Sequence, residues 1–124
     1  MAYKIIWEAK GLLVNFSGTV TEKEVMMVND LIYGDKRFET ITYQIADYTG
    51  AVDIQISPRD AQVIGALDKS SSRWNRSRVK NIVVTKDDKF IPIVKTYFRE
   101  FEGTHWEGRI FDTLEMAYAW INSK

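Results

Sequence analysis

Hydrophobic and polar residues recur along this chain at spacings that predict five strands and four helices. Two apolar runs, 3–7 and 12–17, are separated by a short polar stretch with a glycine, which is the spacing of an antiparallel hairpin. Further strands are predicted at 41–47, 79–85 and 107–111. The continuous run Ile82-Val83-Val84 indicates that the fourth strand is covered on both faces.

The helices are predicted from capping signals and from apolar residues at helical spacing. Thr21 and Glu24 match a capping box, and Ser57 before Pro58 is a strong start signal for a second helix. The second helix should bury a stripe formed by Val63, Leu67 and Trp74, joined by Ile64. The third is predicted from Phe90, Val94, Tyr97, Phe98 and Phe101, and the last from Leu114, Ala117, Tyr118 and Ile121.

The resulting order, β-β-α-β-α-β-α-β-α, predicts one α/β domain over residues 1–124. Strands that alternate with helices favour a largely parallel sheet with right-handed crossovers, and the first strand should form an antiparallel edge. A length of 124 residues suits a single core.

Composition narrows the classes of partner and cofactor. Lys+Arg and Asp+Glu are both 17, so no global charge favours nucleic acid, and we expect no nucleic-acid partner. The chain has no cysteine, no nucleotide-binding glycine motif and no apolar run long enough to span a membrane, so we expect no metal, cofactor or membrane span. The first residues do not resemble a signal peptide, which predicts a cytoplasmic protein.

Polar residues follow the third predicted strand and precede the second predicted helix. Asp47, Tyr48 and Thr49 end that strand, and Ser57 begins that helix. Parallel strands present their carboxyl ends at one edge of a sheet, and a helix start favours anions, so these four residues are a candidate binding or phosphoacceptor edge. The alternative is structural: Asp47 and Thr49 form a turn, and Ser57 caps a helix.

Two other groups of residues carry weaker chemical signals, and no catalytic residue is assigned. His105 and Glu107 would share one face of a strand, but one histidine and one carboxylate are too few for a zinc site. The segment 69–80 has five basic residues, no acid and Trp74, and a solvated helix end is favoured over a nucleic-acid or lipid-headgroup contact.

Aromatic side chains near the carboxyl end suggest an apolar pocket. Tyr97, Phe98, Phe101 and Trp120 on the last two helices could wall a site for a lipid-like ligand. Ordinary core packing is the alternative for residues at this spacing.

Several motifs together resemble the SpoIIAA-like, or STAS-type, family. They are the initial hairpin ending in Phe16-Ser17-Gly18, the strand ending in Asp47-Tyr48-Thr49, and Phe111-Asp112-Thr113 leading to Trp120. Asp35-Lys36-Arg37-Phe38 resembles an uncharacterised bacterial branch that is likened to lipid-binding CRAL-TRIO domains.

The resemblance implies an α/β fold of the kind found in anti-sigma-factor antagonists, where a serine at the start of the second helix is phosphorylated. The segment 53–58 does not preserve the antagonists' Asp-Ser-Ser-Gly-like run, but Ser57 lies at a comparable place.

Three functions follow as hypotheses. The first is a non-enzymatic regulatory or adaptor module that binds a protein partner or forms a homodimer. The second is a carrier or sensor of a hydrophobic small molecule, and it requires an enclosed apolar cavity. The third is an acid-base enzyme, and it requires Asp47, His105 and Glu107 to converge in one cleft.

Overall fold

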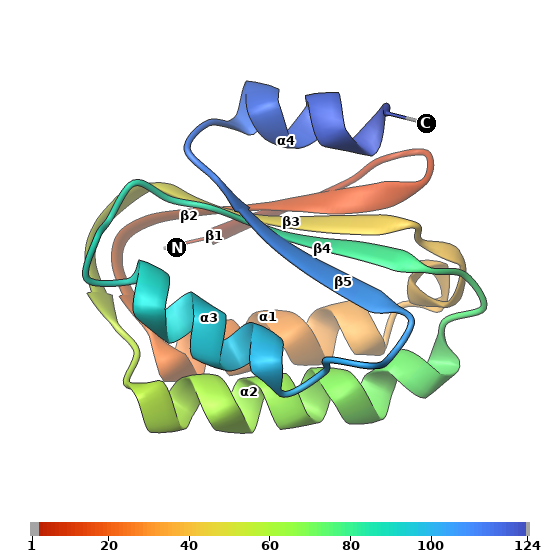
Figure 1. Cartoon of the computed structure of the whole chain (residues 1–124), viewed down its shortest axis with the longest axis horizontal. Helices are drawn as coiled ribbons and strands as arrows, with labels where there is room; N and C mark the ends of the chain where they lie inside the picture. Colours follow the sequence, from red (N-terminus) through yellow and green to blue (C-terminus); the bar gives the residue numbers. More distant parts are fainter. Residues whose placement is uncertain (1–2, 124) are drawn as a thin grey trace.

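The computed structural model describes residues 3–123 and shows one five-stranded sheet with helices on both faces (Figure 1). The strands are β1 (Tyr3–Trp7), β2 (Gly11–Thr21), β3 (Tyr43–Gln55), β4 (Val79–Val84) and β5 (Trp106–Phe111). The α-helices are α1 (Glu22–Tyr33), α2 (Pro58–Ser71), α3 (Ile91–Arg99) and α4 (Leu114–Ile121), and two short 3₁₀ helices are η1 (Lys36–Thr40) and η2 (Ser72–Trp74).

The strands lie side by side in sequence order, β1-β2-β3-β4-β5. The β1–β2 pair is antiparallel and the other three pairs are parallel. Because each new parallel strand is added on the same side of the last, right-handed crossovers put α1, α2 and α3 on one face of the sheet. The chain then turns over β5, and α4 lies alone on the other face (Figure 1). The predicted α/β fold class is confirmed.

Each face of the sheet has its own core. The larger core lies between the sheet and the three-helix layer and includes Leu12, Val14, Phe16, Val28, Ile32, Tyr48, Ile64, Val83, Phe90, Val94 and Phe101. The smaller core lies under α4 and contains Leu13, Tyr43, Ile45, Ile82, Val84 and Ala117. Side chains alternate between the two faces of the sheet along β3, so Tyr43 and Ile45 lie in the smaller core and Ala46 and Tyr48 lie in the larger one.

The third strand is longer than predicted, because it does not end at Asp47 but continues to Gln55. Its pairing with β2 contains two irregularities, between Asn15 and Ser17 and between Gly18 and Thr19. At each of them β3 has one more residue than β2, which is a β-bulge and bends the strand. The extended β2–β3 pair therefore curls round the end of the molecule towards the start of α2 (Figure 1).

The predicted buried stripe of the second helix is wrong for Val63, Leu67 and Trp74 and confirmed for Ile64. Val63, Leu67 and Trp74 are 46%, 41% and 69% exposed, whereas the buried residues of α2 are Ala61, Ile64, Gly65 and Asp68. The reason is a close contact with α3: a Cβ atom on Gly65 would lie 2.7 Å from the Tyr97 carbonyl oxygen. Only the face of α2 that carries small residues fits there, so the larger apolar residues point outward.

Candidate functional site

The polar stretch that begins at Asp47 is a β-bulge. The Asp47 carboxylate accepts hydrogen bonds from the Thr49 amide (3.0 Å) and from the Thr49 hydroxyl (2.7 Å), both through Oδ1. Gly50 follows at a point where a Cβ atom would lie 3.0 Å from the Phe16 carbonyl oxygen. Asp47, Thr49 and Gly50 therefore form a local backbone motif, but it is a bulge inside β3 and not the turn that the structural alternative predicts.

Tyr48 lies between them but points to the opposite face of the sheet from Asp47. Its ring stacks on Phe16 at a centroid distance of 4.7 Å and contacts Phe90 at the same distance. Burial raises the pKa of the Tyr48 phenol well above its ordinary value. Tyr48 is a core residue, and its side chain is not part of an exposed edge.

Ser57 is an exposed residue that caps α2. Its Oγ accepts a hydrogen bond from the Asp60 amide (3.0 Å), and the Asp60 carboxylate accepts one from the Ser57 amide (2.9 Å). This is a full capping box with Pro58 in the first turn, so the predicted helix start is confirmed. The amide groups of the first turn and the helix dipole make this end of α2 favourable for negative charge.

The four residues of the predicted edge lie at two places, with Asp47, Tyr48 and Thr49 in the middle of β3 and Ser57 at the start of α2. Within residues 3–123 no hydrogen bond joins Ser57 to Asp47 or Thr49, and Gln55, the last residue of β3, lies eight steps along the strand from Asp47. At about 3.3 Å per residue, that strand path is about 26 Å long before its bend. Ile56 and Tyr48 line one cavity, so the segment curls over the helical layer, but Asp47 faces the side of α4.

The cavity between the sheet and α1–α3 has a volume of about 70 Å³ and is lined mostly by apolar side chains. Of the four aromatic residues predicted to wall an apolar pocket, only Tyr97 lines it. Phe98 and Phe101 pack nearby in the same core, and Trp120 lies on the other face of the sheet against Phe111. A dry cavity that holds benzene is about 150 Å³. The space here is thus too small for a lipid-like ligand.

A buried polar network lies where α1, α2 and α3 meet the sheet. The hydroxyl of Tyr97 donates a hydrogen bond to the Asp68 carboxylate, and the Asn81 amide donates one to Tyr97 Oη (2.7 Å). Asn29 Nδ2 lies 3.5 Å from Asp68 Oδ1. Burial raises the pKa of Asp68 to about 7, although the hydrogen bond from Tyr97 acts in the opposite direction. The network is enclosed, so we assign it a structural role and not a binding role.

The predicted enzyme residues do not converge. Asp47 is opposite Val84 at the carboxyl end of β4, whereas Glu107 is opposite Lys80 near its amino end. Those two positions on β4 are four residues, or about 13 Å, apart. His105 and Glu107 do line one pocket at that amino end. In the described residues, no three His, Cys, Asp or Glu side chains are placed to hold a metal ion.

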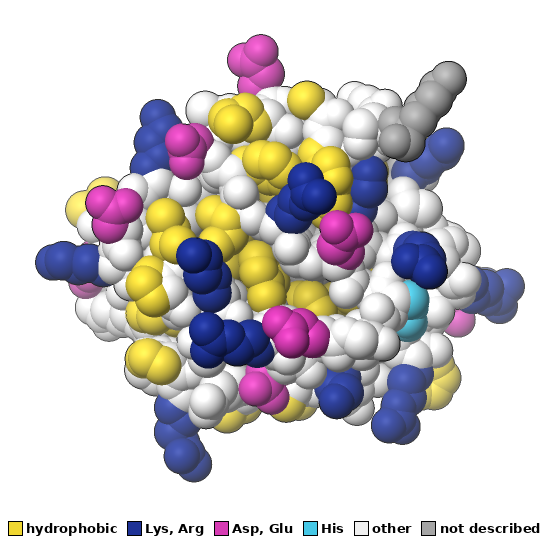
Figure 2. Space-filling model, viewed as in Figure 1, with side chains coloured by type: hydrophobic (Ala, Val, Ile, Leu, Met, Phe, Trp, Pro, Cys, Tyr) yellow, Lys and Arg dark blue, Asp and Glu magenta, His cyan; other side chains and the backbone are white. Residues whose placement is uncertain are grey.

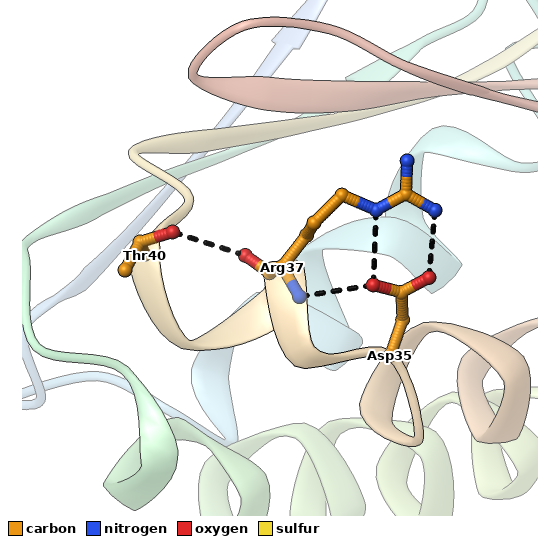
Figure 3. A network of polar contacts seen from close by, with 3 residues as sticks. All are labelled: Asp35, Arg37 and Thr40. Carbon is orange, nitrogen blue, oxygen red and sulfur yellow. Dashed lines mark hydrogen bonds and ion pairs between the residues drawn. The ribbon is translucent and has the colours of Figure 1, made fainter.

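The Asp35-Arg37 motif anchors the chain before β3. Arg37 makes two hydrogen bonds to the Asp35 carboxylate through its guanidinium (3.0 and 2.7 Å), and Thr40 donates one to the Arg37 carbonyl oxygen (Figure 3). These hydrogen bonds from Arg37 lower the pKa of Asp35 to about 2. The Arg37 guanidinium also lies 4.2 Å from the Trp7 ring centroid. The next residue, Phe38, is buried in the core. The motif thus joins η1 to β1 and the core.

Exposed apolar side chains on the helical layer are the surface feature that the sequence prediction missed. Val63, Leu67 and Trp74 follow one another at helical spacing on the outer face of α2 and η2, and we call them the α2 stripe. Their i, i+4 and i+11 spacing predicts a stripe that faces the core, whereas in the structure these three side chains face solvent. Apolar spacing alone does not say which side of a helix faces inward. Gly65 is the one sequence signal for the buried side, because a small residue allows another helix to come close, whereas an aspartate such as Asp68 predicts an exposed side.

Comparison with solved structures identifies the fold. The anti-sigma factor antagonist SpoIIAA in its unphosphorylated form superposes with a TM-score of 0.65 at 10% sequence identity, over 99% of this chain and 100% of that chain. The phosphorylated form of the Bacillus cell-fate determinant SpoIIAA gives a TM-score of 0.60 at 12% identity, over 98% and 100% of the two chains.

An uncharacterized protein from Shewanella loihica PV-4 with a SpoIIAA-like fold gives a TM-score of 0.51 at 16% identity, over 96% of this chain and 91% of that chain. At these identities the likeness establishes the fold, so the chain has a SpoIIAA-like fold and the resemblance found in the sequence is confirmed at that level. No family model matches the chain, and no curated protein matches its sequence. In the described residues, no helix is both long and apolar enough to cross a bilayer.

Proposed function

We propose that this protein is a non-enzymatic regulatory module that binds a protein partner along α2, and that phosphorylation of Ser57 controls this binding. The observation that carries the proposal is the exposed hydroxyl of Ser57 at the first turn of α2 in a SpoIIAA-like fold. SpoIIAA is an anti-sigma factor antagonist with an unphosphorylated and a phosphorylated form. Ser57 begins the second helix, a place comparable with the phosphorylated serine that the resemblance implies for the antagonists, and this supports the proposal.

The chemistry of the helix start supports a switch at this position. A phosphate group would add about −1.5 to −2 charge and three acceptor oxygens at a helix end that favours anions. The phosphate would also lie close to the Asp60 carboxylate, which accepts a hydrogen bond from the Ser57 amide. The two negative groups repel each other, so phosphorylation would break the capping box and change both the charge and the shape of this end of α2.

The outer face of α2 supports protein contact on the same helix. The α2 stripe exposes two aliphatic side chains and one indole, all large apolar groups, to solvent. Isolated exposed apolar residues are ordinary, but a row along one helix face is a common contact for a partner protein. Ser57 lies at the amino end of the same helix, so its modification would act directly on a partner bound to the stripe.

The hypothesis of a hydrophobic carrier is not favoured, because the cavity under the sheet is only about 70 Å³. The acid-base enzyme is not favoured either, because Asp47 and Glu107 lie at opposite ends of β4. Self-association is an alternative use of the α2 stripe. In that case the partner would be a second copy, and sedimentation velocity would detect a dimer that Leu67→Glu abolishes.

Affinity capture from the native cell extract with four forms of the purified protein tests the proposal. Wild type and Thr113→Asp, a matched change at the cap of α4 on the other face, should retain the same partner. Ser57→Asp and Leu67→Glu should lose it by about tenfold or more. Circular dichroism checks that all four forms are folded. A partner that is held equally by all four forms, or no reproducible partner, would contradict the proposal.

A further inference from the structure

A pocket of about 290 Å³ lies at the amino ends of β4 and β5, on the side of α4 and away from the capped end of α2. We call it the amino-edge pocket. Its polar lining consists of Thr42, Arg78, Lys80, Thr104, His105 and Glu107. Its volume is close to the lower end of the range for small-molecule sites, so it suits a ligand of a few carbons.

The topology explains why these residues meet. Thr42, Arg78 and His105 are each the last residue before a strand, namely β3, β4 and β5. These strands are parallel neighbours, so their amino ends share one edge of the sheet. Backbone hydrogen bonds fix this edge, because the Lys80 amide donates to the Thr42 carbonyl (3.0 Å) and the Val79 amide donates to the His105 carbonyl (3.1 Å).

The pocket has an excess of positive charge. In residues 3–123, neither Arg78 nor Lys80 forms an ion pair with a carboxylate. Glu107 is the only acidic residue in the lining, and its carboxylate lies 3.8 Å from Arg109 Nε. Lys80 Nζ is held in place by a hydrogen bond to the Trp120 carbonyl oxygen at the end of α4 (2.9 Å). Two cations therefore line a concave site where no protein anion neutralises them.

The histidine adds a third nitrogen group. His105 Nε2 is buried and has no hydrogen-bond partner among the described residues. Figure 2 shows the single histidine (cyan) at the edge of the molecule with Lys and Arg side chains (dark blue) around it. A buried polar atom without a partner is uncommon in folded proteins, and His105 also lines the amino-edge pocket, so a rotation of its imidazole would bring Nε2 to a ligand bound there.

We propose that the amino-edge pocket binds a small phosphate monoester that also carries a hydroxyl group. The Arg78 guanidinium offers a fork of N–H donors that fits two phosphate oxygens, and Lys80 and His105 offer further nitrogen groups for the third. A carboxylate has only two oxygens and would leave one of these groups unused. Glu107 accepts a hydrogen bond from the hydroxyl group of the ligand, which explains a carboxylate in a site for an anion.

The single histidine makes the test direct, because its imidazole proton signals in an NMR spectrum have only one source. Glycerol 3-phosphate is the probe, and inorganic phosphate, glycerate and glycerol are compared with it at constant ionic strength. Glycerol 3-phosphate should shift the His105 signals saturably in the millimolar range or below. Glycerol should have no effect, and inorganic phosphate should bind more weakly.

Two arginine variants separate a built site from general charge attraction. Arg78→Gln should weaken binding about tenfold or more, because it removes charge-assisted hydrogen bonds to the ligand. Arg76→Gln is the matched control: Arg76 is exposed, lies two residues away and does not line the pocket. It should leave the affinity unchanged, and circular dichroism checks that both variants are folded.

Three results would overturn the proposal. The first is the absence of a saturable shift up to about 20 mM glycerol 3-phosphate, a concentration that corresponds to negligible affinity. The second is an equal response of the two arginine variants, which would mean nonspecific attraction only. The third is binding of glycerate without binding of glycerol 3-phosphate, which would exclude a phosphate ester. Isothermal titration calorimetry on His105→Gln, which should also bind more weakly, gives a readout independent of the imidazole signals.

Discussion

Replacement of Asp68 by asparagine is expected to make the protein more stable at neutral and alkaline pH. Asp68 is only 1% exposed, and no cation pairs with it in the described residues. Its neighbours are the hydroxyl of Tyr97 and the amide of Asn29, which are neutral hydrogen-bond donors. A buried carboxylate in such surroundings costs free energy, and the protonated acid does not.

The size of the effect follows from the pKa of Asp68. Burial raises it from 3.8 to about 7. At 1.36 kcal/mol per pKa unit, this corresponds to about 4 kcal/mol. The folded state binds a proton more tightly than the unfolded state does. The contribution of Asp68 to the free energy of unfolding is therefore highest below about pH 4, falls between about pH 4 and pH 7, and is lost above the folded pKa.

Urea unfolding of wild type and Asp68→Asn across pH 4 to 8.5 measures this directly. The asparagine cannot ionise, so the stability difference in its favour should grow by about 2–4 kcal/mol as pH rises through this window. Asp88→Asn, a change at an exposed residue, is the matched control and should show no such growth. A difference between wild type and Asp68→Asn that does not depend on pH would refute the reasoning.

Two further substitutions test the packing that shapes the α2 surface and the bulge in β3. Gly65→Ala should lower the free energy of unfolding by about 1–3 kcal/mol, because its Cβ would lie 2.7 Å from a carbonyl oxygen of α3; an unchanged urea midpoint would contradict the close contact. Asp47→Ala should cost about 1–3 kcal/mol by leaving two donors of Thr49 without an acceptor, and Thr49→Val should cost less; the reverse order of the two losses would contradict the bulge structure.

The order of strands and helices could be predicted because each element has a local signal. The glycine between the first two strands signals the hairpin. The residues before α1, α2 and α4 are Thr21, Ser57 and Thr113, and each of these side chains accepts a hydrogen bond from the amide of the third helical residue. The length of β3 could not be predicted, because its bulges depend on pairing with β2, which is remote in sequence. The local pattern therefore predicts that the strand ends at Asp47, Tyr48 and Thr49.

The orientation of α2 and the two candidate sites depend on tertiary structure in the same way. The inward face of α2 is set by the close contact of Gly65 with α3, which no single-helix pattern reports. The residues of the amino-edge pocket come from three strand starts that no motif connects. Ser57 could be identified as a helix cap and a candidate phosphoacceptor, because its signal is local.

Hydrogen–deuterium exchange of the protein with and without its captured partner tests the central claim most directly. The account predicts slower exchange in the partner complex at the start of α2 and along the helix that carries the α2 stripe, from Ser57 to Trp74, and faster exchange at the same amides when Ser57→Asp is mixed with the same partner. Protection confined to α4 or to the β1 edge, with α2 unchanged, would contradict it.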